Sequence, residues 1–176
     1  EDLETTESIT FDHLGRQCDV HDDDLPRFVE TVYQLQSQTS DVPPLYPGIA
    51  EVMRTLAARH TVAIVTANLA TAVQRLLQHH SLDRAVTRIL DGRAPGAKSD
   101  KIASLYREFD VPPQESFMIG DAISDIRQGK HAGVRTIAVT WGFQRRDLLL
   151  AESPDVVADK PEDLLGKSTQ MLYADQ

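Results

Sequence analysis

The sequence has few of the features that mark secreted or membrane-bound proteins. It contains a single cysteine, Cys18, which excludes a disulfide within the chain and suits a reducing compartment. No apolar run approaches the ~20 residues that a membrane-spanning helix needs, and no basic-then-apolar signal sequence opens the chain. We therefore expect a cytoplasmic protein that does not contact a membrane.

Clustered positive charge is also scarce. The formal net charge is −9, and the arginines are scattered apart from the pair Arg145 and Arg146. Proteins that bind nucleic acid need clustered Lys and Arg against the phosphate backbone, so we expect no nucleic-acid partner. Hydrophobic residues make up 41% and charged residues 26% of the chain, which is ordinary for one globular domain with a small appendage.

From Tyr46 onward, short apolar runs alternate with stripes of apolar residues at helical spacing. The runs that predict strands are residues 61–66, 85–90, 117–119, 136–139 and 156–157. The stripes that predict helices are residues 49–60, 73–77, 102–109, 126–131 and 148–150. Strands that alternate with helices of about ten residues indicate crossover units and a parallel sheet. The sequence therefore predicts an α/β fold, a doubly wound parallel sheet with helices on both faces.

The first 44 residues lack this alternation and predict helices alone. Apolar residues recur at helical spacing at Leu25, Phe28, Val29, Val32 and Leu35. Asp22–Asp24 crowd the start of this helix, where the helix dipole favours negative charge. Residues 9–14 predict one more short helix, and residues 37–44 have the composition of a linker. We expect a partial helical cap over residues 1–44 and an α/β core over residues 45–176.

Polar residues stand at the ends of the predicted strands, where open parallel sheets bind ligands. Thr66 ends the first strand, and Ala67 and Asn68 precede the next helix. A hydroxyl beside backbone N–H groups at a helix start suits an anion, although a threonine there is more often a helix cap. Lys98 lies just ahead of the helix that leads into the strand 117–119, and its ammonium group suits a phosphate. Taken alone, Lys98 reads as a surface lysine.

Two carboxylates, Asp121 and Asp125, follow the strand 117–119. Mg²⁺ takes hard oxygen ligands, and proteins usually hold it with one or two carboxylates and several waters. Alternatively, Asp121 is a helix N-cap and Asp125 a solvated acid in the first helical turn. Together with Thr66 and Lys98, in this order on these elements, the two carboxylates predict a phosphate and magnesium site.

These segments carry a family resemblance. Residues 61–68 (TVAIVTAN), Lys98 and residues 117–139 resemble the second, third and fourth motifs of the haloacid dehalogenase (HAD) superfamily. Residues 45–49 (LYPGI) and the ending from residue 140 (TWGF) resemble its phosphoglycolate-phosphatase-like branch. The resemblance implies a Rossmann-like core with a helical cap, a Mg²⁺ cofactor, and hydrolysis of a small phosphorylated metabolite through an aspartyl-phosphate.

The same resemblance implies a role for each phosphate-binding candidate. Thr66 would hydrogen-bond the transferring phosphoryl group, with help from the backbone around Ala67 and Asn68. Lys98 would neutralise the charge of the phosphate and of the nucleophilic carboxylate. The third motif is the loosest of the set, so Lys101 stays an alternative to Lys98.

The resemblance also implies roles for the two aspartates. Asp121 would ligate Mg²⁺, directly or through water. Asp125 would support the metal from the side, by way of a metal-bound water or the lysine. The implied catalytic set is Thr66, Lys98, Asp121 and Asp125.

The first motif of the superfamily, an apolar strand that ends in Asp-x-Asp, is not visible in the sequence. The first Asp of that motif is the nucleophile and the second is the general acid–base. The nearest match is residues 9–15, which place Asp12 first but Leu14 where the second Asp should stand. Residues 4–8 before it are too polar for a buried central strand. We therefore expect Asp12 to belong to a helix of the cap.

Two explanations for the missing motif stay open: the chain is a fragment, or it is a natural protein without the catalytic strand. The first is favoured, because that strand lies in the middle of the family's sheet, and without it two strands face a gap with unpaired backbone groups. We expect the chain alone to be inactive and its full-length parent to be a phosphatase. The alternatives are another chemistry of the superfamily, such as a sugar-phosphate mutase, or a non-catalytic phosphate- and metal-binding module. A homodimer also stays open.

Overall fold

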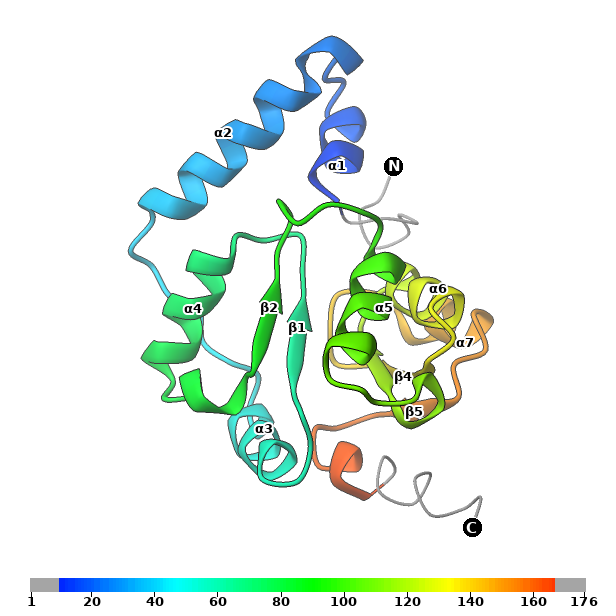
Figure 1. Ribbon diagram of the computed structural model, residues 1–176. Helices are drawn as coiled ribbons and strands as arrows, with labels where there is room; N and C mark the ends of the chain where they lie inside the picture. Colours follow the sequence, from blue (N-terminus) through cyan, green and yellow to red (C-terminus); the bar gives the residue numbers. More distant parts are fainter. Residues whose placement is uncertain (1–9, 167–176) are drawn as a thin grey trace.

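The computed structural model describes residues 10–166, in which helices surround two small parallel sheets (Figure 1). The helices are α1 (Phe11–Gln17), α2 (Leu25–Gln38), α3 (Ile49–Ala57), α4 (Ala70–His79), α5 (Lys98–Glu108), α6 (Ile123–His131) and α7 (Arg146–Ala151). The strands are β1 (Ala63–Val65), β2 (Arg88–Leu90), β3 (Phe117–Gly120), β4 (Arg135–Val139) and β5 (Val156–Ala158). Short 3₁₀ turns are η2 (Asp22–Asp24), η3 (Asp83–Ala85) and η4 (Pro113–Glu115). The order of strands and helices follows the predicted alternation, with boundaries that differ by a few residues.

The helices α1 and α2 pack against each other at the N-terminal end of the described chain (Figure 1). Gly15 of α1 is buried, and a Cβ atom there would collide with Leu25 and Phe28 of α2. The absence of a side chain at this position therefore lets the two helices approach closely. Asp12 lies in the first turn of α1, which confirms that it belongs to a helix and not to the end of a strand.

The segment between α2 and α3 forms the connection to the sheets. α2 continues to Gln38 and the backbone becomes extended at Thr39, so the predicted start of the linker at residue 37 is two residues early. The predicted division into a cap over residues 1–44 and a core over residues 45–176 stays a prediction, and residues 1–9 and 167–176 lie outside the described part.

The five strands run parallel to their neighbours but lie in two sheets. β1 pairs with β2, with Ile64 opposite Ile89. β4 is the middle strand of the second sheet, between β3 and β5. The predicted parallel α/β fold is confirmed, while its single sheet is divided in two. Within residues 10–166 no strand joins β1 to β3, so each of these two strands keeps one edge without ladder hydrogen bonds.

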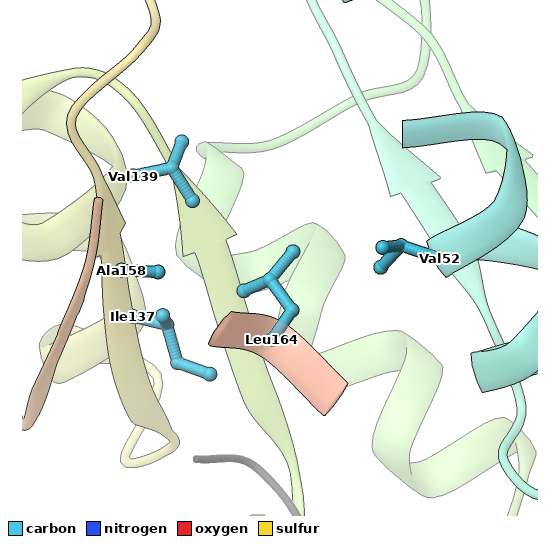
Figure 2. Close-up of a cluster of buried hydrophobic side chains, with 5 residues drawn as sticks. All are labelled: Val52, Ile137, Val139, Ala158 and Leu164. Carbon is cyan, nitrogen blue, oxygen red and sulfur yellow. The ribbon is translucent and has the colours of Figure 1, made fainter. Parts of the chain in front are cut away.

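The helix α3 holds the two sheets together. Val52 of α3 points toward Leu164, and the cluster around them continues to strands β4 and β5 through Ile137, Val139 and Ala158 (Figure 2). Other α3 side chains pack in a second cluster that contains Ile64 of β1 and Ile89 of β2. Away from α3, α5 contacts β1, α6 contacts β3, and these two helices contact each other. The two sheets therefore lie beside each other with shared helical neighbours.

The strands that border the division are less buried than their apolar sequences predict. All three residues of β1 are only half-buried, and Ile119 of β3 is 37% exposed, whereas Ile137 and Ala138 of β4 are 0% exposed. The nearly all-apolar run at residues 61–66 predicts a strand that is covered on both faces, and the half-buried β1 does not meet that prediction. β4 has a strand on each side, while β1 and β3 each have one. None of the helices within residues 10–166 combines the length and apolar character needed to cross a bilayer.

Candidate phosphate and metal site

The turn from β3 into α6 carries the two aspartates. The N-cap of α6 is Ala122, so the alternative in which Asp121 caps this helix is wrong. The Oδ2 atom of Asp121 instead accepts a hydrogen bond from the Phe143 N–H at 2.7 Å. Asp125 does lie in the first turn of α6, where its Oδ2 atom accepts from the Ala122 N–H at 3.3 Å. It is 5% exposed, so it is a buried carboxylate and not a solvated one.

Lys98 and Asp125 form a short ion pair, with 2.5 Å between Lys98 Nζ and Asp125 Oδ1. Lys98 is the first residue of α5, and the two side chains are 24% and 7% exposed. Gly120 at the end of β3 leaves room for this carboxylate, because a Cβ atom there would collide with it. The oxygens of Asp125 are thus engaged by Lys98 and by the Ala122 N–H, which makes Asp125 a partner of the lysine.

Lys101 lies one helical turn after Lys98 but has a different partner. Its Nζ atom donates to the carbonyl oxygen of Asp91 at 2.8 Å, in the loop after β2. Burial, followed by the nearby charge of Lys98, lowers the pKa of the Lys101 ammonium group, although Asp91 acts in the opposite direction. Of the two candidate lysines, Lys98 is the one that contacts the loop with the two aspartates.

Thr66 directly follows β1. Its N–H donates to the Leu90 carbonyl at 3.0 Å, and its Oγ1 atom accepts from the Asn68 N–H at 3.1 Å. Because this bond uses the hydroxyl as an acceptor, the hydroxyl hydrogen is left to donate to another group. α4 begins later, with Leu69 as its N-cap, so Thr66 is not the helix cap that its position alone suggested.

Gln36 of α2 reaches the loop that contains Asn68. Its Nε2 atom donates to Asn68 Oδ1 at 2.6 Å, and its Oε1 atom accepts from the Leu69 N–H at 3.0 Å. Arg75 of α4 in turn donates to the Gln36 carbonyl at 2.5 Å. The end of α2 is therefore held against the loop after β1. Sequence reasoning missed Gln36, because a single glutamine on an amphipathic helix carries no motif.

Asp91, in the loop after β2, links the Thr66 loop to α5. Its Oδ2 atom accepts from the Ala70 N–H at 3.1 Å, while its carbonyl takes the Lys101 ammonium group. The next residue, Gly92, donates its N–H to the Asn68 carbonyl at 3.2 Å. The loops after β1 and β2 and the start of α5 therefore form one hydrogen-bonded rim. Among the described residues, no hydrogen bond joins Thr66 directly to Lys98 or Asp121.

The loop after β4 completes the surroundings of Asp121. The Phe143 N–H donates to the Asp121 carboxylate, and the Gln144 N–H donates to the Asp121 carbonyl oxygen at 3.2 Å. At Gly142 a Cβ atom would collide with the Asp121 side chain. Gly142 and Gln144 were also missed from the sequence. The glycine beside Phe143 in TWGF was the available signal, but its spacing alone does not identify Asp121 as its neighbour.

The carboxylate of Asp121 suits a magnesium ion that is held by few protein ligands. Its Oδ2 atom takes the Phe143 N–H, which fixes the carboxylate and leaves the other oxygen for a ligand. Across residues 10–166, no three His, Cys, Asp or Glu side chains are grouped so as to hold a metal ion. Mg²⁺ commonly takes one or two protein carboxylates and completes its shell with water and substrate phosphate, and Asp121 suits that pattern.

A hollow of about 390 Å³ lies between α2 and the start of α4. It is lined by Glu30, Tyr33, Gln34, Ser37, Leu69, Ala70, Thr71, Asp91 and Arg93. Arg93 binds Glu30 through a 2.9 Å ion pair and stacks over the Tyr33 ring at 5.1 Å. None of the predicted site residues lines this hollow, so it is a neighbour of the Thr66 loop and separate from the Lys98–Asp125 pair.

Comparison with proteins of known structure supports the fold. A haloacid dehalogenase-like hydrolase from Streptococcus pneumoniae superimposes with a TM-score of 0.77 at 22% sequence identity, covering 95% of this chain and 81% of that one. At this identity the likeness concerns the arrangement of helices and strands.

Sequence comparisons are more specific. A phosphoglycolate phosphatase from Synechococcus elongatus is 28% identical over 143 residues, which cover 79% of this chain and 68% of the relative. The pyrophosphatase PpaX from Bacillus cereus is 33% identical over 124 residues, 68% of this chain and 57% of the relative. The chain thus spans between half and about two thirds of these relatives. The family model of haloacid dehalogenase-like hydrolases matches residues 1–139, and the chain belongs to this family.

Proposed function

We propose that the chain forms the phosphate- and metal-binding part of a Mg²⁺-dependent phosphomonoester hydrolase that acts on a small phosphorylated metabolite through an aspartyl-phosphate. The observation that carries this proposal is the partly buried Lys98–Asp125 pair beside Asp121, with 2.5 Å between Nζ and Oδ1. It lies beyond the carboxyl end of β3, where parallel sheets bind their ligands. The names of the relatives, a phosphoglycolate phosphatase and a pyrophosphatase, agree with phosphoryl chemistry.

Asp121 is the magnesium ligand in this proposal. The Phe143 N–H orients one carboxylate oxygen, so the other is presented to the ligand in a fixed direction. A magnesium ion held there would neutralise phosphate oxygens and polarise the phosphoryl group. Asp125 supports Asp121 indirectly, because its oxygens are engaged by Lys98 and by the start of α6.

Lys98 binds the phosphate. Its ammonium group has three donors, of which Asp125 takes one, so the others can donate to phosphate oxygens. The Asp125 carboxylate holds the lysine side chain near the end of β3. The 24% exposure of the lysine side chain is consistent with a group that is partly buried and still reaches a ligand.

Thr66 supplies a second phosphate contact through its hydroxyl hydrogen. Its oxygen is oriented by the Asn68 N–H, so the hydrogen points away from that amide. Because the Asn68 N–H is already used in this bond, we assign the Ala67 N–H as the backbone donor to the anion. The Oδ1 atom of the Asn68 side chain accepts a hydrogen bond from Gln36, and this bond does not use the two Nδ2 hydrogens.

The nucleophile in this proposal comes from a strand that lies between β1 and β3 and is not part of this chain. Within residues 10–166 both strands keep an unpaired edge, and a parallel strand between them would end near Thr66 and Asp121. Asp12 is unsuited to this role because it lies in α1. We therefore propose that the 176-residue chain alone does not hydrolyse phosphate esters.

The test compares the 176-residue chain with the full-length product of its gene. Both are assayed on p-nitrophenyl phosphate, phosphoglycolate and pyrophosphate, with and without Mg²⁺. We expect turnover by the full-length protein only, dependent on Mg²⁺ and lost in Asp121→Asn. Turnover by the 176-residue chain would contradict an external nucleophile, and a full-length protein without Mg²⁺-dependent hydrolysis would contradict the proposed function.

A second candidate is a non-catalytic module that binds phosphate and metal. It is favoured by one observation: the Lys98–Asp125 pair and the support of Asp121 are in place in a chain whose sequence shows no apolar strand that ends in Asp-x-Asp. Metal-dependent phosphate binding by the full-length protein, without turnover of any phosphate ester, would select this candidate.

A further inference from the structure

Three helices begin at the candidate site, and all of them start without a capping side chain. The N-cap residues of α4, α5 and α6 are Leu69, Ala97 and Ala122. None of these has a side-chain oxygen, whereas effective N-caps are Ser, Thr, Asp and Asn. The N–H groups at these helix starts therefore need acceptors from elsewhere.

Glutamines from other elements provide such acceptors. In each case a glutamine Oε1 atom accepts from a backbone N–H. Gln36 accepts from Leu69 at 3.0 Å, Gln128 from Ser99 at 3.1 Å, and Gln144 from Ile123 at 2.5 Å. Gln36 belongs to α2, Gln128 to α6, and Gln144 to the loop after β4. Each helix start is therefore tied to a neighbouring element, in addition to the bonds that Asp100 and Asp125 accept from the N-cap N–H groups of their own helices.

Gln144 has the most constrained place of the three. It is 2% exposed, and a buried amide in that position is costly unless its polar atoms are bonded. Its side chain holds the Ile123 N–H while its own N–H holds the Asp121 carbonyl. Gln144 thus bonds to the β3–α6 turn on both sides of Ala122. It directly follows Phe143, whose N–H orients the Asp121 carboxylate.

We propose that Gln144 is a positioning residue for the magnesium ligand Asp121. It acts through the turn, because its Oε1 atom accepts from the Ile123 N–H and its own N–H donates to the Asp121 carbonyl. Loss of that acceptor leaves the first N–H of α6 unbonded and lets the turn that carries Asp121 shift. The inference rests on the proposed function, since it takes Asp121 to be a metal ligand.

The test measures Mg²⁺ affinity of the 176-residue chain by titration with MgCl₂, with no activity readout. Trp141, the only tryptophan of the chain, reports through its fluorescence, because it lies two residues before Phe143. Gln144→Met keeps the volume and removes the acceptor, whereas Gln144→Glu keeps an acceptor oxygen. Gln144→Asn is a second variant, too short to reach Ile123. The exposed Gln74 provides the control Gln74→Met.

We expect Gln144→Met and Gln144→Asn to weaken Mg²⁺ binding about 10- to 100-fold, as for other residues that orient metal ligands. Gln144→Glu should restore the affinity and Gln74→Met should leave it unchanged. A lower unfolding temperature with unchanged affinity would mean a purely structural glutamine and would overturn the inference. Wild-type binding that survives Asp121→Asn, or no Mg²⁺ binding at all, would overturn the metal assignment of the proposed function as well.

Discussion

The Lys98–Asp125 pair gives a prediction that does not depend on catalysis. Lys98→Met removes the cation and leaves a carboxylate that is 7% exposed with the Ala122 N–H as its remaining partner. Breaking a fully buried ion pair costs about 3–5 kcal/mol. Because the lysine side chain is 24% exposed and water can reach the vacated space, we expect a loss of about 2 kcal/mol. For a chain of this size that corresponds to a fall in unfolding temperature of about 4–8 °C.

A double-mutant cycle with Asp125→Asn isolates the interaction between the two side chains. In urea denaturation followed by circular dichroism, the loss caused by Lys98→Met should shrink by about 1 kcal/mol or more when Asp125 is already Asn. The exposed pair Arg16–Asp22, with side chains 57% and 74% exposed, is the control, and Arg16→Met should cost at most about 0.5 kcal/mol. Additivity within about 0.3 kcal/mol at Lys98 and Asp125 would refute the pairing.

Two further predictions concern Tyr33 of α2 and the loop beside Asp121. Burial, followed by the charge of Asp91, raises the pKa of the Tyr33 phenol above 10.0. The folded state therefore keeps the Tyr33 proton to higher pH than the unfolded state. The stability that this adds is fully present below pH 10 and is lost as the pH rises further. In Tyr33→Phe, the free energy of unfolding measured by denaturation should fall less steeply above pH 10 than in the wild type. Gly142→Ala places a Cβ against the Asp121 side chain, and we expect a loss of about 1–3 kcal/mol together with weaker Mg²⁺ binding; an unchanged Mg²⁺ affinity would contradict the close approach.

The fold was predictable from residue 46 onward because two periodicities alternate there. Ile137, Ala138 and Val139 of β4 are apolar where the strand is buried, and α3 has its apolar residues at helical spacing toward both sheets. What the pattern could not give is the division between β1 and β3. Periodicity reports which residues are apolar, and it does not report whether a neighbouring strand is present to cover them.

The site was predictable to the extent that each residue follows a strand. The sequence placed Lys98 and Asp125 at one edge of the sheet, but their direct contact depends on the packing of α5 against α6. It gave no indication of Gln144 or Asp91, because their roles are to accept hydrogen bonds from backbone N–H groups that are distant in sequence. Backbone N–H groups are the same in every residue, so no motif marks which of them a side chain will reach.

The division of the sheet separates the candidate site into two parts that differ in how they are held. On the side of β3, Asp121, Asp125, Lys98 and Gln144 are joined by hydrogen bonds that involve only α5, α6 and the loop after β4. On the side of β1, the hydrogen bonds that link Thr66 to them within residues 10–166 run through β2 and the loop after it, while β1 also packs against α5. We therefore expect the geometry around Asp121 to depend less on a strand between β1 and β3 than the distance from Thr66 to Asp121 does. If the proposed function holds, we therefore expect metal affinity and the Lys98–Asp125 coupling to be measurable in this chain by itself, and phosphoryl transfer to require in addition that the two parts are fixed relative to each other.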